Sequence, residues 1–122
     1  MPKKILIVDD EPRIIVPVQF MMEQNGYDVM IAFSGEEAME IIDENKIDLI
    51  LLDIMLPVID GFEVCQRVRE NPQWYKIKII LLTALDSDAN VKKGLSLGAN
   101  AYITKPFSNV EIVDKVKELL EE

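Results

Sequence analysis

One stretch of the chain, Asp48-Leu49-Ile50-Leu51-Leu52-Asp53-Ile54-Met55-Leu56-Pro57, sets the architecture of the rest. Its four consecutive apolar residues, 49–52, predict a strand covered on both faces, the pattern of the inner strands of a parallel sheet. Asp53 ends this strand, and Pro57 and Gly61 then turn the chain into a loop. In open parallel sheets, ligands bind beyond the carboxyl ends of the strands. Asp53 is therefore the first candidate for a side chain that carries chemistry.

Length and composition narrow the classes of function. The 122 residues predict a single domain, over 1–122, with one hydrophobic core. A net charge of −9 argues against nucleic acid, and against an anionic membrane, as a direct partner. No apolar run reaches the length of a membrane span. The single cysteine, Cys65, excludes an internal disulfide and fits a cytoplasmic location.

The chain has no histidine. It can therefore carry neither a Ser-His or Cys-His nucleophile pair nor a histidine-based zinc site. Whatever chemistry it performs must rest on carboxylates, hydroxyls, lysines or a hard metal ion.

Strands and helices are expected to alternate along the whole chain. Apolar runs predict strands at residues 5–8, 27–33, 49–52, 77–83 and 101–104. Capping and stop residues, among them Ser34, Ser108 and Gly26, predict helices at residues 12–25, 34–46, 61–71, 87–97 and 108–120. Right-handed crossovers then give an α/β fold, a doubly wound (βα)5 arrangement with a five-stranded parallel sheet and helices on both faces.

Four of the five predicted strands end in reactive polar side chains: Asp9 with Asp10, Asp53, Thr83 and Lys105. If the strand ends lie side by side, three carboxylates converge and repel one another unless protons or a cation neutralise them. A hard divalent ion such as Mg²⁺ fits this need. A carboxylate nucleophile, a metal, a lysine and a hydroxyl together suit phosphoryl transfer, and a carboxylate can itself accept a phosphoryl group.

These residues stand in motifs that resemble those of the receiver domains of bacterial two-component response regulators. The motifs cover most of the chain and are Ile7-Val8-Asp9-Asp10-Glu11, Leu51-Leu52-Asp53-Ile54-Met55-Leu56-Pro57-Val58-Ile59-Asp60-Gly61, Leu82-Thr83-Ala84 and Tyr102-Ile103-Thr104-Lys105-Pro106-Phe107. The resemblance implies a flavodoxin-like fold, similar to that of the chemotaxis regulator, with strand order 2-1-3-4-5. It also implies a phosphorylation switch in a two-component phosphorelay.

The resemblance further implies roles at the site. Asp53 would be the phosphoacceptor, and Asp10, Asp53 and the backbone carbonyl of Met55 would hold Mg²⁺ or Mn²⁺ directly. Asp9 would act on the metal through a water molecule. Lys105 would contact the phosphoryl oxygens.

Two further features follow from the resemblance. Thr83 would also contact the phosphoryl group and would form the switch with Tyr102, whose ring would rotate inward. The peptide bond between Lys105 and Pro106 is expected to be cis. Val58 stands where the family usually has glycine, and we expect it to stiffen its loop.

A receiver takes its phosphoryl group from a histidine kinase or a histidine phosphotransfer protein, and it acts on a downstream effector protein or a fused output domain. The start of the helix at 12–25 is apolar and lies beside Asp10. We expect Ile14 and Ile15 to form a docking patch for the phosphoryl donor, together with Pro57 and Pro106.

The lifetime of the phosphorylated state can also be anticipated. Met55 and Leu85 each stand two residues after a site residue, and both are apolar. Neither can orient or activate a water molecule that attacks the acyl phosphate. We therefore expect slow self-dephosphorylation.

Two other classes of function stay open. A Mg²⁺-dependent phosphatase with an aspartyl nucleophile shares the chemistry, but its nucleophile follows the first strand in an Asp-x-Asp arrangement that Asp9-Asp10 does not match. A phosphate-independent interaction module of the same fold would not need Asp53, Thr83 and Lys105 together. The sequence favours a signalling switch that catalyses only its own phosphorylation and slow dephosphorylation, rather than an enzyme that turns over a metabolite.

Overall fold

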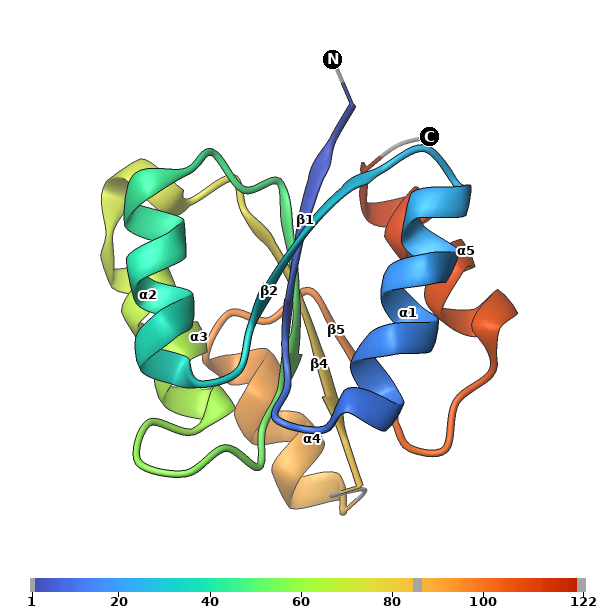
Figure 1. Cartoon of the computed structure of the whole chain (residues 1–122). Coiled ribbons are helices and arrows are strands. Elements are labelled where there is room, and N and C mark those ends of the chain that lie inside the picture. Colours follow the sequence, from blue (N-terminus) through green and yellow to red (C-terminus); the bar gives the residue numbers. More distant parts are fainter. Residues whose placement is uncertain (1, 85–86, 121–122) are drawn as a thin grey trace.

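Five parallel strands form one sheet in the order β2-β1-β3-β4-β5 (Figure 1). The structure is a computed structural model that describes residues 2–84 and 87–120. The strands are β1 Lys4–Val8, β2 Asp28–Ala32, β3 Leu49–Asp53, β4 Lys78–Thr83 and β5 Ala101–Thr104. Both the (βα)5 arrangement and the strand order expected from the sequence are confirmed.

Helices cover both faces of the sheet (Figure 1). One face carries α1 Pro12–Gln24 and α5 Asn109–Leu120, and the other carries α2 Gly35–Glu44, α3 Gly61–Glu70 and α4 Asp88–Ser96. A short 3-10 helix, Pro72–Trp74, follows α3 and was not anticipated. Over residues 2–84 and 87–120, none of the helices has the length and apolar character that a bilayer crossing requires.

The inner strands β1, β3 and β4 are buried because helices pack on both sides of them. The residues of β3 show the pattern most fully, since all five are buried. Side chains alternate along each strand and therefore pack in two apolar clusters, one on each face of the sheet. Cys65 lies fully buried in one of these clusters, which fits a packing residue.

Side-chain caps fix where the helices begin. Ser34 Oγ accepts a hydrogen bond of 3.1 Å from the amide of Glu37, as the sequence predicted for α2. Ser108 caps α5 in the same way. The cap of α3 was not anticipated: Asp60 Oδ1 accepts a 2.9 Å hydrogen bond from the amide of Glu63. Asp60 thereby fixes the residue at which the loop after β3 ends.

The strand register brings the carboxyl ends of four strands to one edge of the sheet. Val8 pairs with Leu52 across β1 and β3, and Asp53 pairs with Leu82 across β3 and β4. Thr83 pairs with Thr104 across β4 and β5. The polar side chains at or just beyond these ends therefore lie together, as the sequence predicted.

Candidate functional site

Three aspartates meet at the carboxyl ends of β1 and β3. Asp53 is the last residue of β3 and is 4% exposed, and Asp9 follows β1 directly and is 1% exposed. Asp10 is exposed at the mouth of the site. One carboxylate oxygen from each of the three lies within 4.8 Å of the others. Such a set of oxygen ligands suits a hard divalent cation.

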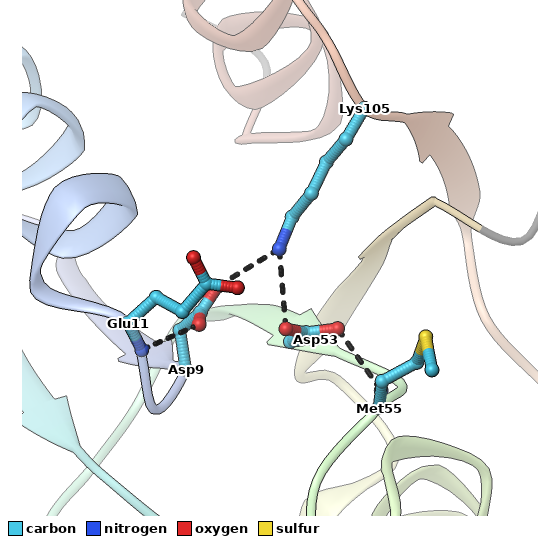
Figure 2. A network of polar contacts seen from close by, with 5 residues as sticks. All are labelled: Asp9, Glu11, Asp53, Met55 and Lys105. Carbon is cyan, nitrogen blue, oxygen red and sulfur yellow. Dashed lines mark hydrogen bonds and ion pairs between the residues drawn. The ribbon is translucent and has the colours of Figure 1, made fainter.

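Lys105 supplies the positive charge that the aspartates require. Its side chain reaches from the loop after β5 to a position between Asp9 and Asp53 (Figure 2). The Lys105 Nζ lies 3.1 Å from Asp53 Oδ2 and 3.3 Å from Asp9 Oδ2. The structure thus joins residues from the ends of three strands in one ion-pair network.

Backbone amides orient the two buried carboxylates. The amide of Glu11 donates a 2.9 Å hydrogen bond to Asp9 Oδ1, and the amide of Met55 donates one of 3.0 Å to Asp53 Oδ1 (Figure 2). In each case the donor lies two residues after the aspartate, so the loop itself holds the carboxylate. One oxygen of each aspartate therefore faces its own loop, and the other faces Lys105.

Burial and neighbouring charges together raise the pKa values of both Asp9 and Lys105. Burial raises the pKa of Asp9, and the charge of Asp53 adds to this effect, while the amide of Glu11 and the charge of Lys105 oppose it. Burial alone would lower the pKa of Lys105, but the charges of Asp53 and Asp9 outweigh it and raise that pKa. Lys105 is therefore held in its charged form beside the aspartates.

Gly61 packs directly against the backbone of Asp53, a contact that the sequence did not predict. A Cβ placed on Gly61 would lie 2.4 Å from the carbonyl oxygen of Asp53 and 2.6 Å from the Cα of Ile54. The Gly61 amide also donates a 2.9 Å hydrogen bond to the carbonyl of Ile54. Glycine is required because the start of α3 touches the backbone that carries the site. The signal in the sequence is its place in the loop after Asp53, which by itself indicates only a turn and a helix start.

Thr83 and Tyr102 lie on neighbouring strands and face the same side of the sheet. Thr83 ends β4 and is fully buried, whereas Tyr102 in β5 is half-buried. Tyr102 pairs with Leu81, two residues before Thr83. Because side chains alternate along a strand, Leu81, Thr83 and Tyr102 point to the face that α4 covers.

The expected docking patch on α1 needs a correction. Ile15 is only 3% exposed and packs in the cluster between α1, α5 and the sheet, so the expectation that it lines a surface patch is wrong. Ile14 is half-buried. The exposed apolar side chains of α1 are instead Val16 at 62% and Phe20 at 64%. Sequence reasoning missed them because α1 is apolar all round, so periodicity does not distinguish its inner face.

The loops around the site hold the remaining expected residues. Pro57 and Pro106 are both exposed, and the peptide bond between Lys105 and Pro106 is cis, as expected. Val58 is 88% exposed and has φ of +67°, a left-handed conformation that β-branched residues rarely adopt.

Of the two residues expected to control dephosphorylation, Met55 lies in the part of the chain that the structure describes. Met55 is 59% exposed beside Asp53. Leu85 lies outside the described residues.

Comparisons with known proteins agree with this geometry. The family profile described as "Response regulator receiver domain" matches residues 5–117. The alkaline phosphatase synthesis transcriptional regulatory protein PhoP of Bacillus subtilis is 48% identical over 120 residues, which are 98% of this chain and 49% of that protein. The chain thus spans about half the length of that curated relative.

Solved structures show the same fold over the whole chain. A CheY-like response regulator receiver domain protein from Methanospirillum hungatei is 34% identical with a TM-score of 0.92, and the match covers 99% of this chain and 95% of that one. The BeF3-activated DrrB receiver domain is 35% identical with a TM-score of 0.90, and the match covers 100% of both chains.

Proposed function

Because this chain belongs to the response regulator receiver family of two-component systems, we propose that it is a phosphorylation switch whose phosphoacceptor is Asp53. The observation that carries the proposal is the placement of Asp53, buried at the end of β3 with Lys105 Nζ at 3.1 Å and two further aspartates beside it. On this proposal residues 1–122 act as one receiver domain.

The proposed reaction at the site is a single phosphoryl transfer. A carboxylate oxygen of Asp53 forms a bond to phosphorus while the bond from phosphorus to the donor's imidazole nitrogen breaks, and that nitrogen keeps the electron pair. The Met55 amide holds Asp53 Oδ1, so the orientation of the nucleophile is set before the donor arrives. Lys105, 3.1 Å from Asp53 Oδ2, would neutralise the negative charge that gathers on the phosphoryl oxygens, and Thr83 ends the adjacent strand with a hydroxyl that could donate to one of them.

The aspartate cluster fits Mg²⁺ or Mn²⁺. Asp10, Asp53 and the carbonyl of Met55 would hold the ion directly, and Asp9 would act through a water molecule. Three carboxylate oxygens within 4.8 Å form a hard, negatively charged donor set, which supports this assignment. When bound, the ion would neutralise charge on the phosphoryl oxygens. The DrrB receiver, which shares this fold, is described as activated by BeF3.

The conformational response would run through Thr83 and Tyr102. The two side chains face the same side of the sheet on adjacent strands, so a shift of the Thr83 hydroxyl toward the phosphoryl group would change the space next to the Tyr102 ring. Tyr102 is half-buried, which leaves its ring both an inward and an outward direction in which to rotate.

Docking of the donor would use the exposed side of α1. Val16 and Phe20 stand one helical turn apart and are both more than half exposed. They offer the exposed apolar surface that the buried Ile15 does not. The donor would also contact Ile14, Pro57 and Pro106 around the site. The donor would be a histidine kinase or a histidine phosphotransfer protein. A downstream effector or a fused output domain would read the switch, and the name of the PhoP relative makes a transcriptional output domain one form to test.

Intact mass after incubation with acetyl phosphate and Mg²⁺ tests the proposal. We expect one added phosphoryl group, which is lost in Asp53→Asn and in a parallel sample with chelator. Thr83→Ala serves as a matched control, because it keeps the nucleophile and should slow the uptake rather than abolish it. Uptake by Asp53→Asn would contradict the assignment of the phosphoacceptor. Rapid release of inorganic phosphate without accumulation of the phosphoprotein would instead identify a phosphatase.

A further inference from the structure

Helix α4 rests on the sheet in an unusual way. It lies wholly in the described part of the chain, and Gly94 is the one buried residue among its nine. Leu95 is 47% exposed, and the Lys93 ammonium lies 4.5 Å from the centre of the Phe62 ring on α3. An ordinary surface helix buries a stripe of large apolar side chains, whereas the residue that α4 buries is a glycine, which has no side chain.

One of the two side chains that meet this backbone, Tyr102, belongs to the proposed switch. A Cβ on Gly94 would lie 3.2 Å and 3.4 Å from two carbons of the Tyr102 ring, Cδ2 and Cε2. It would also lie 2.6 Å from Cδ1 of Leu81, the residue that pairs with Tyr102 across β4 and β5. The Tyr102 ring therefore lies against the α4 backbone at the place where every other residue type would put a side chain.

We propose that Gly94 is a positioning residue for Tyr102: the absence of a side chain at residue 94 lets the ring occupy its present place, and the positions of the ring and of α4 depend on each other. Protein interiors are close-packed, so a ring that leaves this surface removes the support of α4, and a helix that lifts makes room for the ring. The meaning of this coupling for signalling rests on the proposed function, but the coupling itself does not.

The prediction for Gly94→Ala follows from these contacts. The new methyl group would collide with Leu81 Cδ1, which must move aside, and would lie in tight contact with the ring. The ring must therefore shift by a few tenths of an ångström or α4 must lift. Phosphoryl uptake at Asp53 should continue, because the groups nearest to a Cβ at Gly94 are Leu81 and Tyr102 rather than the aspartates or Lys105. The resting position of Tyr102 should change, and with it the response of the ring to a phosphoryl analogue.

The test uses NMR of protein with isotopically labelled tyrosine rings, first without any phosphoryl donor. The chain has three tyrosines, and two of them act as internal references: Tyr27 packs in the cluster on the opposite face of the sheet, and Tyr75 is exposed in the segment before β4. We expect Gly94→Ala to shift the Tyr102 signals and to leave those of Tyr27 and Tyr75 in place. Lys92→Ala, an exposed change in the same helix, controls for general effects of a substitution in α4 and should shift none of the three. Unchanged Tyr102 signals in Gly94→Ala would overturn the proposal.

Two more variants separate the ring from Leu81 and cover the case in which Gly94→Ala does not fold. Leu81→Val removes the Cδ1 atom, and the Tyr102 shift caused by Gly94→Ala should persist in that background. Tyr102→Ala in the otherwise unchanged chain should move the amide signal of Gly94, whereas Tyr102→Phe, which keeps the ring, should leave it nearly unchanged. An unmoved Gly94 signal in Tyr102→Ala, or a ring shift that disappears with Leu81→Val, would refute the coupling through the ring.

Because these spectra are recorded without a phosphoryl donor, they remain informative if the phosphorylation proposal fails. A second series with beryllofluoride then tests the link to signalling. Gly94→Ala should show the same phosphoryl uptake by intact mass as the unchanged protein, but a smaller movement of the Tyr102 signals on beryllofluoride addition. Equal movement in both proteins would overturn the regulatory part of the inference.

Discussion

The Nζ of Lys105 lies 3.1 Å from Oδ2 of Asp53, although 52 positions separate the two residues in the chain. The same ammonium lies 3.3 Å from Oδ2 of Asp9. A single cation is thus shared between two buried carboxylates, and it occupies a position next to the oxygens that a divalent ion would need. On the proposed function, Lys105 would therefore have two opposite effects, since it stabilises the metal-free site and would compete with metal binding.

Replacing Lys105 with methionine should separate these effects. Lys105→Met removes the charge and keeps an unbranched side chain. We expect Mg²⁺ to bind more tightly by calorimetric titration, and the free energy of unfolding in chelator to fall by roughly 3 kcal/mol because two buried carboxylates lose their partner. Lys115→Met is the control, since its ion pair with Glu118 is exposed and contributes little. Weaker Mg²⁺ binding by Lys105→Met would contradict the competition argument.

Adding a methyl group at Gly61 should disturb the proposed phosphoacceptor, Asp53. In Gly61→Ala the new Cβ collides with the backbone of Asp53 and Ile54, which cannot move aside as a flexible side chain would. We expect slower uptake from acetyl phosphate by intact mass, and a loss of about 1–3 kcal/mol in urea unfolding.

The control for Gly61 is Gly26→Ala. Gly26 has φ of +88°, but its Cβ would meet no heavy atom within 4 Å. That variant should lose stability through backbone strain alone and keep the rate of uptake of the unchanged protein. Equal uptake rates in Gly61→Ala and Gly26→Ala would show that Gly61 does not position Asp53.

Releasing the left-handed backbone at residue 58 should stabilise the protein. Val58 is exposed, so its removal costs little burial, whereas its φ of +67° is unfavourable for a β-branched residue. We expect Val58→Gly to raise the free energy of unfolding by about 0.5–1 kcal/mol, the strain relieved less the added flexibility of glycine in the unfolded chain. Val58→Asn should give a smaller gain, because asparagine tolerates this conformation. A lower stability of Val58→Gly in urea unfolding would be the contrary outcome.

Phosphoryl transfer from the cognate kinase should depend on the exposed side chains of α1. Val16→Ala and Phe20→Ala should slow transfer in a radiolabel assay and leave uptake from acetyl phosphate unchanged, because they alter docking and not the site. Ile15→Ala should act differently, since it removes a buried side chain and should cost about 2–5 kcal/mol of stability. Tyr75→Ala, an exposed aromatic change far from the site, should affect neither reaction. Unchanged transfer by both α1 variants would exclude this docking surface.

The phosphorylated state should be long-lived, and Met55 should contribute to its lifetime. The Met55 side chain is exposed next to Asp53 but offers no group that can orient water. We expect Met55→Asn to shorten the lifetime of the phosphoprotein severalfold, measured as the decay of the added mass after the donor is removed. Met55→Leu keeps an apolar side chain and should decay as the unchanged protein does. Rapid decay that Met55→Asn does not accelerate would refute the expectation.

The alternation of apolar runs with capped helices was sufficient to predict the fold. Crossover handedness and strand burial are general constraints, so local patterns predicted a parallel sheet with polar residues at the strand ends. The strand order, which brings Asp9, Asp53, Thr83 and Lys105 to one edge, was implied by the family resemblance and is confirmed by the structure. The residue types then limited the possible reactions. A chain without histidine cannot use a histidine-activated nucleophile, and acids grouped with a lysine favour phosphoryl transfer.

Only the tertiary structure decided how the elements meet. Helix α1 is apolar on every side, so its packing against α5 and the sheet determines that Ile15 is buried and Phe20 exposed. The approach of Gly61 to the Asp53 backbone, and of Gly94 to the Tyr102 ring, likewise depends on where a helix comes to rest on a strand. A periodic pattern specifies the conformation of a segment, but contacts between distant segments depend on close packing, which one segment's sequence does not specify.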